Sequence, residues 1–266
     1  MFELKPRHTF QMLKLIYLPL RARGEALRML LRHAGIPFVN ETIPFADWPA
    51  LKPNVPNNQL PQLQLDGGRL LPHSRDIALH VATLAGPPLL PTDEASAEVA
   101  LDCWRELHST SAPYVDDPWG EATPSDARIG AVHPLLNFMS EERALPLIPR
   151  YLAGTRPWLE TLGERIRSAP EGAFMGGATP HHGEFASFAI CDNIRTLAGS
   201  AALSAAASPE VLTWLESMRA LPAVASHLQR RPQAGTGAVG KPGSLIYEHA
   251  DPAGVVEAYL RTSASG

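Results

Sequence analysis

The sequence predicts a protein in two parts, an α/β domain followed by an all-helical domain, and three observations lead to this division. Short apolar runs typical of strands alternate with stretches of helical periodicity over roughly the first 87 residues. From about residue 92 the chain is rich in Ala, Leu and Glu, and its apolar residues recur at helical spacing. Between the two parts, "GPPLLP" (86–91) is a rigid, non-helical connector.

The first part contains a β-α-β unit followed by a hairpin and a helix. "LKLIYL" (13–18) is typical of a short buried strand, residues 25–34 repeat apolar positions at helical spacing, and 35–45 bring β-branched residues back. A helix between two strands implies that the strands pair in parallel. "LPQLQLDGGRLL" (60–71) alternates apolar and polar residues on both sides of Asp-Gly-Gly, which predicts an antiparallel hairpin, and residues 74–84 are helical.

The second part is expected to be helical throughout, with one long loop. "DDPWGEATPSDAR" (116–128) carries two prolines and many turn-forming residues, so we expect a loop there. The chain therefore divides into 1–87, 92–240 and a C-terminal tail, 241–266, in which 252–260 form a short helix. The expected helices of the second part cover residues 93–111, 141–168, 184–199 and 208–229.

Composition excludes several classes of function. The 23 Lys and Arg residues against 27 Asp and Glu give a net charge of −4, which argues against recognition of nucleic acid by bulk charge. No run approaches the roughly 20 apolar residues that cross a bilayer, so we expect a cytoplasmic protein without a membrane partner. Cys103 and Cys191 form no C-x-x-C pair, and no third metal ligand accompanies His181 and His182, so we expect no metal site. We expect the two histidines to lie in a solvent-facing loop.

Several segments together carry a resemblance to one family. The order β-α-β-α-β-β-α is that of a thioredoxin-like domain, and with an all-α C-terminal domain behind it the chain resembles a cytosolic glutathione transferase. "KLIYLPLRARGEALRMLLRHAGIPF" (14–38) resembles the family's tyrosine-bearing first strand, arginine-glycine loop and first helix. The resemblance extends over roughly 13–233 and is nearest to the Tyr-type sigma class, which includes glutathione-dependent prostaglandin D synthases. The other matching segments are "DWPALKP" (47–53), "NNQLPQLQLDGGRLLPHSRDIALHVA" (57–82) and "LPAVASHLQRRPQ" (221–233).

The resemblance implies that Tyr17 and Arg23 are catalytic. In the family, the tyrosine that ends the first strand donates a hydrogen bond to the sulfur of glutathione, and Tyr17 matches that position. Arg23 matches a loop arginine that approaches the sulfur, where a cation stabilises a thiolate. The ordinary alternatives are a strand tyrosine that packs its ring and an arginine in solvent.

The resemblance also implies a set of residues that bind glutathione. Pro61 matches the family's cis-proline, whose neighbour Leu60 pairs with the cysteinyl backbone, and Ser74 is expected to cap the helix and hold the γ-glutamyl carboxylate. Lys52 supplies the countercharge of the glycyl carboxylate. Two positions depart from the family, because His73 replaces a glutamine and Asp76 replaces a small residue. The full set is Trp48, Lys52, Gln59, Leu60, Pro61, His73 and Ser74.

A second substrate would lie between the two domains. Leu20, Trp104 and Tyr114 are expected to wall an apolar pocket for an electrophile. The implied function is a homodimeric, detoxifying glutathione transferase that uses glutathione as co-substrate. The alternatives are a non-catalytic binding or structural protein on the same fold, and a glutathione-dependent isomerase or peroxidase.

The helical domain's usual Thr/Ser-x-x-Asp capping box is expected in a degraded form at "EFAS" (184–187).

Overall fold

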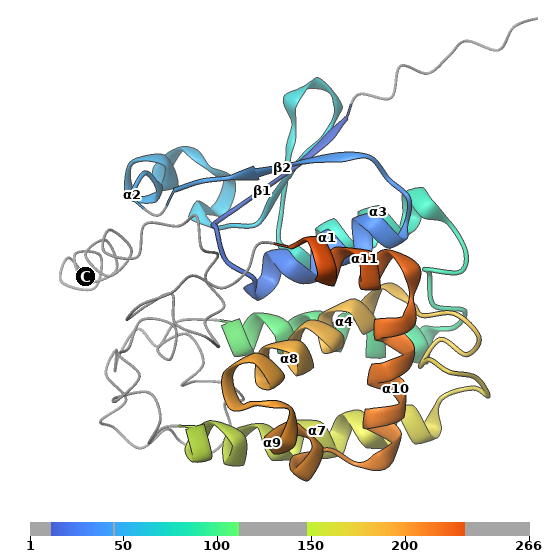
Figure 1. Ribbon diagram of the computed structural model, residues 1–266. Coiled ribbons are helices and arrows are strands. Elements are labelled where there is room, and N and C mark those ends of the chain that lie inside the picture. The colour runs from blue at the N-terminus through green and yellow to red at the C-terminus, as the bar shows by residue number, and fades with distance from the viewer. Residues whose placement is uncertain (1–11, 45, 112–147, 232–266) are drawn as a thin grey trace, which may run out of the picture.

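The computed structural model describes residues 12–44, 46–111 and 148–231, and Figure 1 shows its two parts. A four-stranded sheet forms the N-terminal part, in the order β2-β1-β3-β4. β1 pairs with β2 in parallel and with β3 antiparallel, and β3 pairs with β4 antiparallel, which confirms the predicted β-α-β unit and hairpin. The strands are β1 (Leu13–Tyr17), β2 (Phe38–Thr42), β3 (Gln62–Gln64) and β4 (Leu70–Pro72).

Two helices cover the face of the sheet that is turned toward the helical part, α1 (Ala22–His33) and α3 (Ser74–Ala85). Alternate residues of β1 are buried, so one face of the strand joins the apolar core that α1 supplies through residues such as Leu27 and Leu30. Short helical turns connect β2 to β3, namely α2 (Trp48–Leu51), η1 (Lys52–Asn54) and η2 (Pro56–Asn58), and η3 (Asp66–Gly68) forms the hairpin turn.

The helical part is organised around α8 (His182–Ala198), which is buried continuously from His182 to Ile194. α4 (Glu94–Ser111) packs so closely against it that there is no room for a side chain at Gly183. A Cβ at Gly183 would lie 2.6 Å from the Cα of Ala100. The other helices are α7 (Ile148–Ser168), α9 (Ser200–Ala206), α10 (Pro209–Ala220) and α11 (Pro222–Arg230).

The predicted helices differ from the observed ones in two places. The single helix expected over 208–229 is wrong, because the chain forms α10 and α11, which meet at Leu221. Pro222 causes the break, since it has no N–H to donate and favours the first position of a new helix. α9 is not predicted, and its Ala- and Ser-rich sequence shows little apolar periodicity. The predicted loop 116–128, the residues 141–147 and the tail helix 252–260 lie outside the described residues.

The N-terminus of α8 corrects two further expectations. His181 caps the helix through Nδ1, which accepts a hydrogen bond from Gly183 N at 3.1 Å, and Glu184 accepts one from His181 N at 3.0 Å. An intact capping box therefore occupies 181–184, and the degraded box expected at 184–187 is wrong. The solvent-facing loop is wrong as well, because His181 and His182 are 2% and 1% exposed. Burial lowers the pKa of His181 to about 3 and that of His182 to about 4, so both are neutral.

Glu184 organises the loop before α8 with four hydrogen bonds. Its Oε1 accepts from Gly176 N and His181 N, both at 3.0 Å. Its Oε2 accepts from Met175 N at 2.9 Å and from Trp214 Nε1 at 2.7 Å. Burial raises the pKa of this carboxyl to about 7 although all four hydrogen bonds favour the charged form. One carboxylate thus holds the loop, the start of α8 and α10 together.

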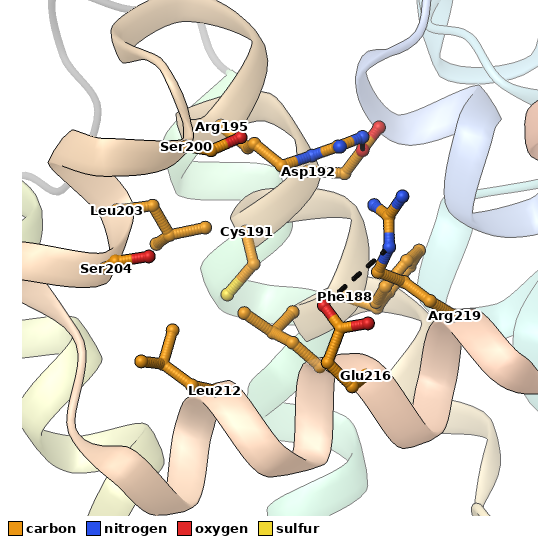
Figure 2. Close-up of a pocket in the computed structure, with 11 residues that line it drawn as sticks. Phe188, Cys191, Asp192, Arg195, Ser200, Leu203, Ser204, Leu212, Glu216 and Arg219 are labelled. Carbon is orange, nitrogen blue, oxygen red and sulfur yellow. Dashed lines mark hydrogen bonds and ion pairs between the residues drawn. The ribbon is translucent and has the colours of Figure 1, made fainter.

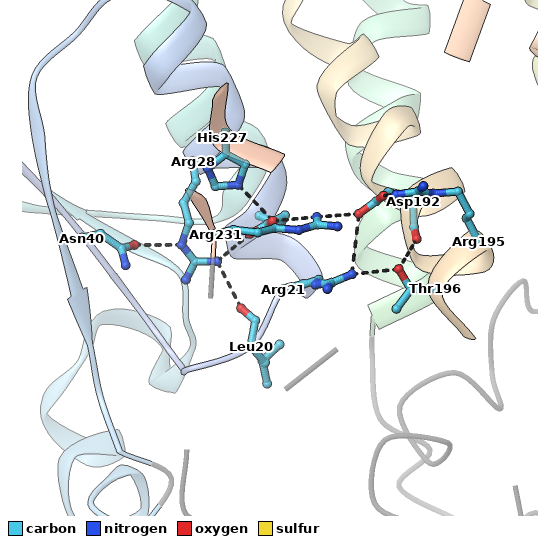
Figure 3. Close-up of polar contacts among 10 residues, drawn as sticks. Leu20, Arg21, Arg28, Asn40, Asp192, Arg195, Thr196, His227 and Arg231 are labelled. Atoms are coloured by element: carbon cyan, nitrogen blue, oxygen red, sulfur yellow. Dashed lines mark hydrogen bonds and ion pairs between the residues drawn. The ribbon is translucent and has the colours of Figure 1, made fainter. Parts of the chain in front are cut away.

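A buried network of charges joins the two parts of the protein (Figure 3). On α1, Glu25 lies 2.9 Å from His227 Nε2, 3.2 Å from Arg28 Nη1 and 3.1 Å from Arg231 Nη1. Arg231 also reaches Asp192 on α8 at 2.6 Å. Burial alone would raise the pKa of Glu25, but His227, Arg28 and Arg231 outweigh it and hold the pKa well below its ordinary range.

The bonds of Glu184 predict the effect of an amide in its place. In Glu184→Gln, either orientation of the amide turns its NH₂ group toward two N–H donors. Leaving buried donors unsatisfied costs about 1–3 kcal/mol each, so we expect a loss of at least about 2 kcal/mol in the free energy of unfolding. Urea denaturation measures it, with the exposed Glu160→Gln on α7 as control. Equal stability of the two variants would contradict the role given to Glu184.

The charge network predicts a pH-dependent loss of stability in Glu25→Gln. The substitution removes the buried carboxylate that pairs with both Arg28 and Arg231, and breaking a buried ion pair typically costs about 3–5 kcal/mol. Because the folded-state pKa of Glu25 is depressed, its contribution is complete above the unfolded value of about 4.3 and disappears as the pH falls through the folded value. The difference from wild type in urea denaturation should therefore be present at about pH 5 and shrink below about pH 4. A difference that grows on acidification would refute this account.

Candidate functional site

A pocket of about 410 Å³ is lined by residues of both parts of the protein. Its N-terminal wall includes Gln59, Leu60, His73 and Ser74, four of the residues predicted to bind glutathione, together with the predicted catalytic Arg23 and with Arg75. Its other wall is α4, which contributes Trp104, Arg105, His108 and Ser109. The structure thus brings six of the predicted site residues around one pocket.

Tyr17 ends β1 beside this pocket without lining it. Its side chain is only 4% exposed and belongs to an apolar cluster with Ala22, Ile43 and Leu60. Leu60 also lines the pocket, so this one residue connects the surroundings of Tyr17 to the pocket wall. Leu60 precedes Pro61 through a cis peptide bond, as expected from the sequence.

The ring of Tyr17 is confined by α1. A Cβ on Gly24 would lie 2.3 Å from Cδ1 and 2.8 Å from Cγ of Tyr17, so only glycine lets the helix approach the ring this closely. The guanidinium of Arg28 lies 5.9 Å from the ring centroid, within the range of a cation–π contact. The position of the phenol therefore depends on the first turns of α1.

Arg23 pairs with a residue that the sequence analysis missed. Its Nη1 lies 3.0 Å from Nδ1 of His108 on α4. Arginine can only donate, so Nδ1 accepts and any proton on the ring sits on Nε2. Partial burial, Arg23 and His73 all lower the pKa of His108, which favours the neutral form that this contact needs. The spacing of Trp104 and His108, four residues apart on one helix, is the signal that could have located His108 in the pocket.

The start of α3 differs from the prediction. Ser74 does not cap the helix, because it is the first helical residue and His73, with φ 65°, occupies the N-cap position. The His73 side chain makes no capping bond and instead its Nε2 lies 2.8 Å from Asn57 Nδ2. Ser74 is 5% exposed and still lines the pocket. Asp76 pairs with Arg75 at 2.9 Å, so its charge is matched within the same turn.

The remaining predicted residues lie outside the pocket wall. Trp48 begins α2 and packs, half-buried, against the cluster around Tyr17, as does Leu20. Lys52 is exposed in η1, and Pro61 is buried behind Leu60. Tyr114 lies outside the described residues. Of the residues expected to wall an electrophile pocket, Trp104 therefore lines the 410 Å³ pocket, whereas Leu20 does not.

The described residues offer no metal centre and no reactive thiol. No three His, Cys, Asp or Glu side chains gather there in a way that could hold a metal ion. Burial raises the pKa of Cys103 to about 12 and raises that of Cys191 still further above its ordinary value. Both thiols are therefore protonated and unreactive at neutral pH. In the same part of the chain, no helix combines the length and the apolar character that a bilayer span requires.

Comparison with known proteins places the chain among relatives of one kind. Residues 24–89 match the family model of the glutathione S-transferase N-terminal domain. Over 105 residues the chain is 36% identical to a probable glutathione S-transferase 6 of Caenorhabditis elegans, covering 38% of this chain and 50% of the relative. Over 226 residues it is 28% identical to a hematopoietic prostaglandin D synthase of Gallus gallus, covering 83% of this chain and 96% of the relative. In its matches to three nematode transferases the chain spans about half the length of each.

The fold agrees with these relatives. The crystal structure of the glutathione S-transferase from Ascaris lumbricoides superposes with a TM-score of 0.60 at 22% identity, covering 84% of this chain and 98% of that protein. The chain is therefore related in sequence to the glutathione transferases, contains their N-terminal domain over residues 24–89 and has their fold.

Proposed function

We propose that the protein is a glutathione transferase that holds the thiolate of glutathione through the hydroxyl of Tyr17 and adds it to an apolar electrophile at α4. The pocket that joins the N-terminal part to α4 is the observation that carries the proposal. Leu60 belongs both to its wall and to the cluster around Tyr17, so a tripeptide paired with the main chain at Leu60 would bring its cysteinyl sulfur toward the phenol.

The energy that such a mechanism requires matches what one phenol can supply. A free thiol with a pKa near 8.5 is only about 3% thiolate at pH 7. Lowering that pKa by ~2 units needs a preference of about 2.7 kcal/mol for the anion. A hydrogen bond to a charged group contributes roughly 1.5–3 kcal/mol. Tyr17 could therefore provide most of the activation, and Arg23 lies in the same pocket as a fixed positive charge.

The charged ends of glutathione fit the two sides of the N-terminal wall. Ser74 and the main-chain N–H groups that begin α3, a helix of 12 residues, suit the γ-glutamyl carboxylate. Gln59, with Trp48 and Lys52 on the neighbouring turns, suits the glycyl end. The electrophile would then lie against Trp104 and His108 on α4. Homodimer formation and a cytoplasmic location belong to the same proposal.

A second candidate is a glutathione-dependent isomerisation on the same site. The match to a hematopoietic prostaglandin D synthase favours it, because that match extends over 226 residues of both parts of the chain. The two candidates share the thiolate and differ in the acceptor. A panel with an aryl halide and a prostaglandin endoperoxide as alternative acceptors separates them.

The role of the phenol predicts the kinetics of Tyr17→Phe. Losing one hydrogen bond to the thiolate should raise the apparent pKa of the pH–rate profile by about 1 to 2 units. Conjugation to a chloronitrobenzene acceptor should fall most at the acidic end of a range of about pH 6 to 8, by roughly 10- to 100-fold. Tyr151→Phe, which removes a buried hydroxyl from α7, is the matched control and should leave the profile in place.

The outcomes distinguish three readings. An unchanged profile in Tyr17→Phe would remove the phenol from the mechanism. Wild-type protein that binds glutathione in calorimetry but conjugates and isomerises none of the acceptors would support a non-catalytic binding protein instead. Wild-type protein that does not bind glutathione would overturn the proposal altogether.

The close approach of α1 predicts that Gly24→Ala acts through the ring of Tyr17. The new methyl would overlap Cδ1, so the ring or the helix must move, at a cost of about 1–3 kcal/mol in stability. The pH–rate profile should shift in the same direction as in Tyr17→Phe. Gly154→Ala is the matched control, because a Cβ there meets no atom within 4 Å. It should stabilise α7 by up to about 1 kcal/mol and leave the profile unchanged. A Gly24→Ala enzyme with wild-type kinetics would mean that the position of the ring is not critical.

A further inference from the structure

The pocket between the two parts of the protein differs from a second pocket in the balance of its charges. The second pocket, of about 330 Å³, lies between α8, α9 and α10, as Figure 2 shows. Its acids match its bases, because Asp192 accepts from Arg195 at 2.8 Å and Glu216 lies 4.0 Å from Arg219. None of the described residues that line the 410 Å³ pocket is an acid, so a cation there depends on partners from elsewhere.

The arginines of the 410 Å³ pocket differ in the partners that they find. Arg75 and Arg105 form ion pairs with acids of their own helices, at distances from 2.6 to 2.9 Å. Arg23 forms no ion pair with a described residue, and its buried Nε atom makes no hydrogen bond there. In this part of the chain the guanidinium of Arg23 is hydrogen-bonded only to His108, on the opposite wall of the pocket.

This contact fixes the orientation of the His108 ring. Nη1 of Arg23 lies 3.0 Å from Nδ1 of His108. Arginine can only donate, so Nδ1 accepts and the proton of the neutral imidazole is on Nε2. Partial burial, Arg23 and His73 all lower the pKa of His108, so the ring is mostly neutral at about pH 7. The result is an N–H donor whose tautomer is set from the opposite wall.

The Nε2–H group of His108 is available to a bound molecule. His108 is exposed where it lines the pocket, and in the described part of the chain its ring makes no hydrogen bond besides the one from Arg23. Its neighbours on α4 are already engaged, because Trp104 donates to His182 at 3.0 Å and Ser109 donates to a main-chain carbonyl of the same helix at 3.0 Å. His108 is therefore an oriented donor on a wall whose other groups already have partners.

Arg23 connects this donor to the reacting sulfur. In the proposed transferase, on which this inference rests, Arg23 is the positive charge beside the thiolate of glutathione. An electrophile that the sulfur attacks must therefore lie close to the histidine that the same guanidinium holds. Trp104, one turn before His108 on α4, offers a flat apolar surface. These surroundings suit a flat conjugated molecule that carries a hydrogen-bond acceptor next to its reacting bond.

We propose that His108 is a further catalytic residue, which donates a hydrogen bond from Nε2 to the carbonyl oxygen of a conjugated enone. The thiolate sulfur forms a bond to the β-carbon, and the π electrons of the C=C bond shift to give an enolate. Negative charge develops on the enolate oxygen, where a fixed N–H donor stabilises it. A proton from the solvent, which replaces the one that the thiol lost, then reaches the α-carbon and gives the saturated ketone.

Two acceptors of similar size separate this role from a structural one. Benzylideneacetone has the carbonyl oxygen of an enone, whereas benzyl chloride has no oxygen. In His108→Leu, kcat/KM for benzylideneacetone should fall about 10- to 100-fold, because the enolate loses a hydrogen bond, and kcat/KM for benzyl chloride should stay unchanged. In His108→Gln the amide can accept from Arg23 and donate through its NH₂ group, so most of the rate with benzylideneacetone should remain.

His80→Leu is the matched control, because it removes an imidazole from α3 outside the pocket wall. It should leave kcat/KM for both acceptors at the wild-type values. Calorimetry should give the wild-type affinity for glutathione in this control and in both His108 variants, which shows that each variant is folded.

The outcomes separate this inference from the transferase proposal. Equal losses with both acceptors in His108→Leu would overturn the inference, because a structural role would then suffice. His108→Gln that is no more active than His108→Leu toward benzylideneacetone would overturn it as well. Wild-type protein that conjugates benzyl chloride but not benzylideneacetone would overturn the role of His108 alone and leave the transferase in place. Wild-type protein that converts neither of these acceptors nor a chloronitrobenzene would remove the transferase and this inference together.

Discussion

The arrangement of the two parts depends on one buried set of ion pairs, in which Arg231 bridges Glu25 and Asp192. Both carboxylates are almost fully buried, and a buried charge is tolerated only when its partners are correctly placed. Glu25 lies on α1 of the N-terminal part and Asp192 on α8 of the helical part, so the network is satisfied only when α1 lies against α8 in one orientation (Figure 3). Apolar packing supplies affinity between the parts, whereas these charges supply a unique position.

α1 connects this charge network to the candidate site, because the helix contributes residues to both. The same helix carries Arg23 into the pocket, leaves space for the Tyr17 ring at Gly24 and places Arg28 over that ring. Arg28 also belongs to the network through Glu25. On the opposite wall, α4 is fixed against α8 by the close approach at Gly183 and by the hydrogen bond from Trp104 to His182. The two walls of the pocket are therefore held by contacts that lie behind them.

Local patterns sufficed to predict the elements whose cause is local. The first strand follows from a short apolar run, the hairpin from the alternation around Asp66-Gly67-Gly68, and the end of α3 from the prolines after Gly86. The errors arise where distant residues decide. The sequence around His181 and His182 is typical of a loop, and their burial depends on contacts with distant elements such as the hydrogen bond that Trp104 of α4 donates to His182. The partner of Arg23 lies 85 residues away in the sequence. The error at Pro222 is different, because the proline is visible in the local sequence. A proline has no N–H to donate inside a helix, so it argues against one continuous helix over 208–229.

The charge network also extends along α8. Asp192, which Arg231 bridges to Glu25, also lies close to Arg21 and Arg195. At Gly199 the backbone turns with φ 94°, and α8 gives way to the short α9. The interaction that fixes the two parts of the protein thus also holds the C-terminal turns of α8, because Arg21 donates to Thr196 at 2.8 Å and Arg195 donates to Asp192 at 2.8 Å.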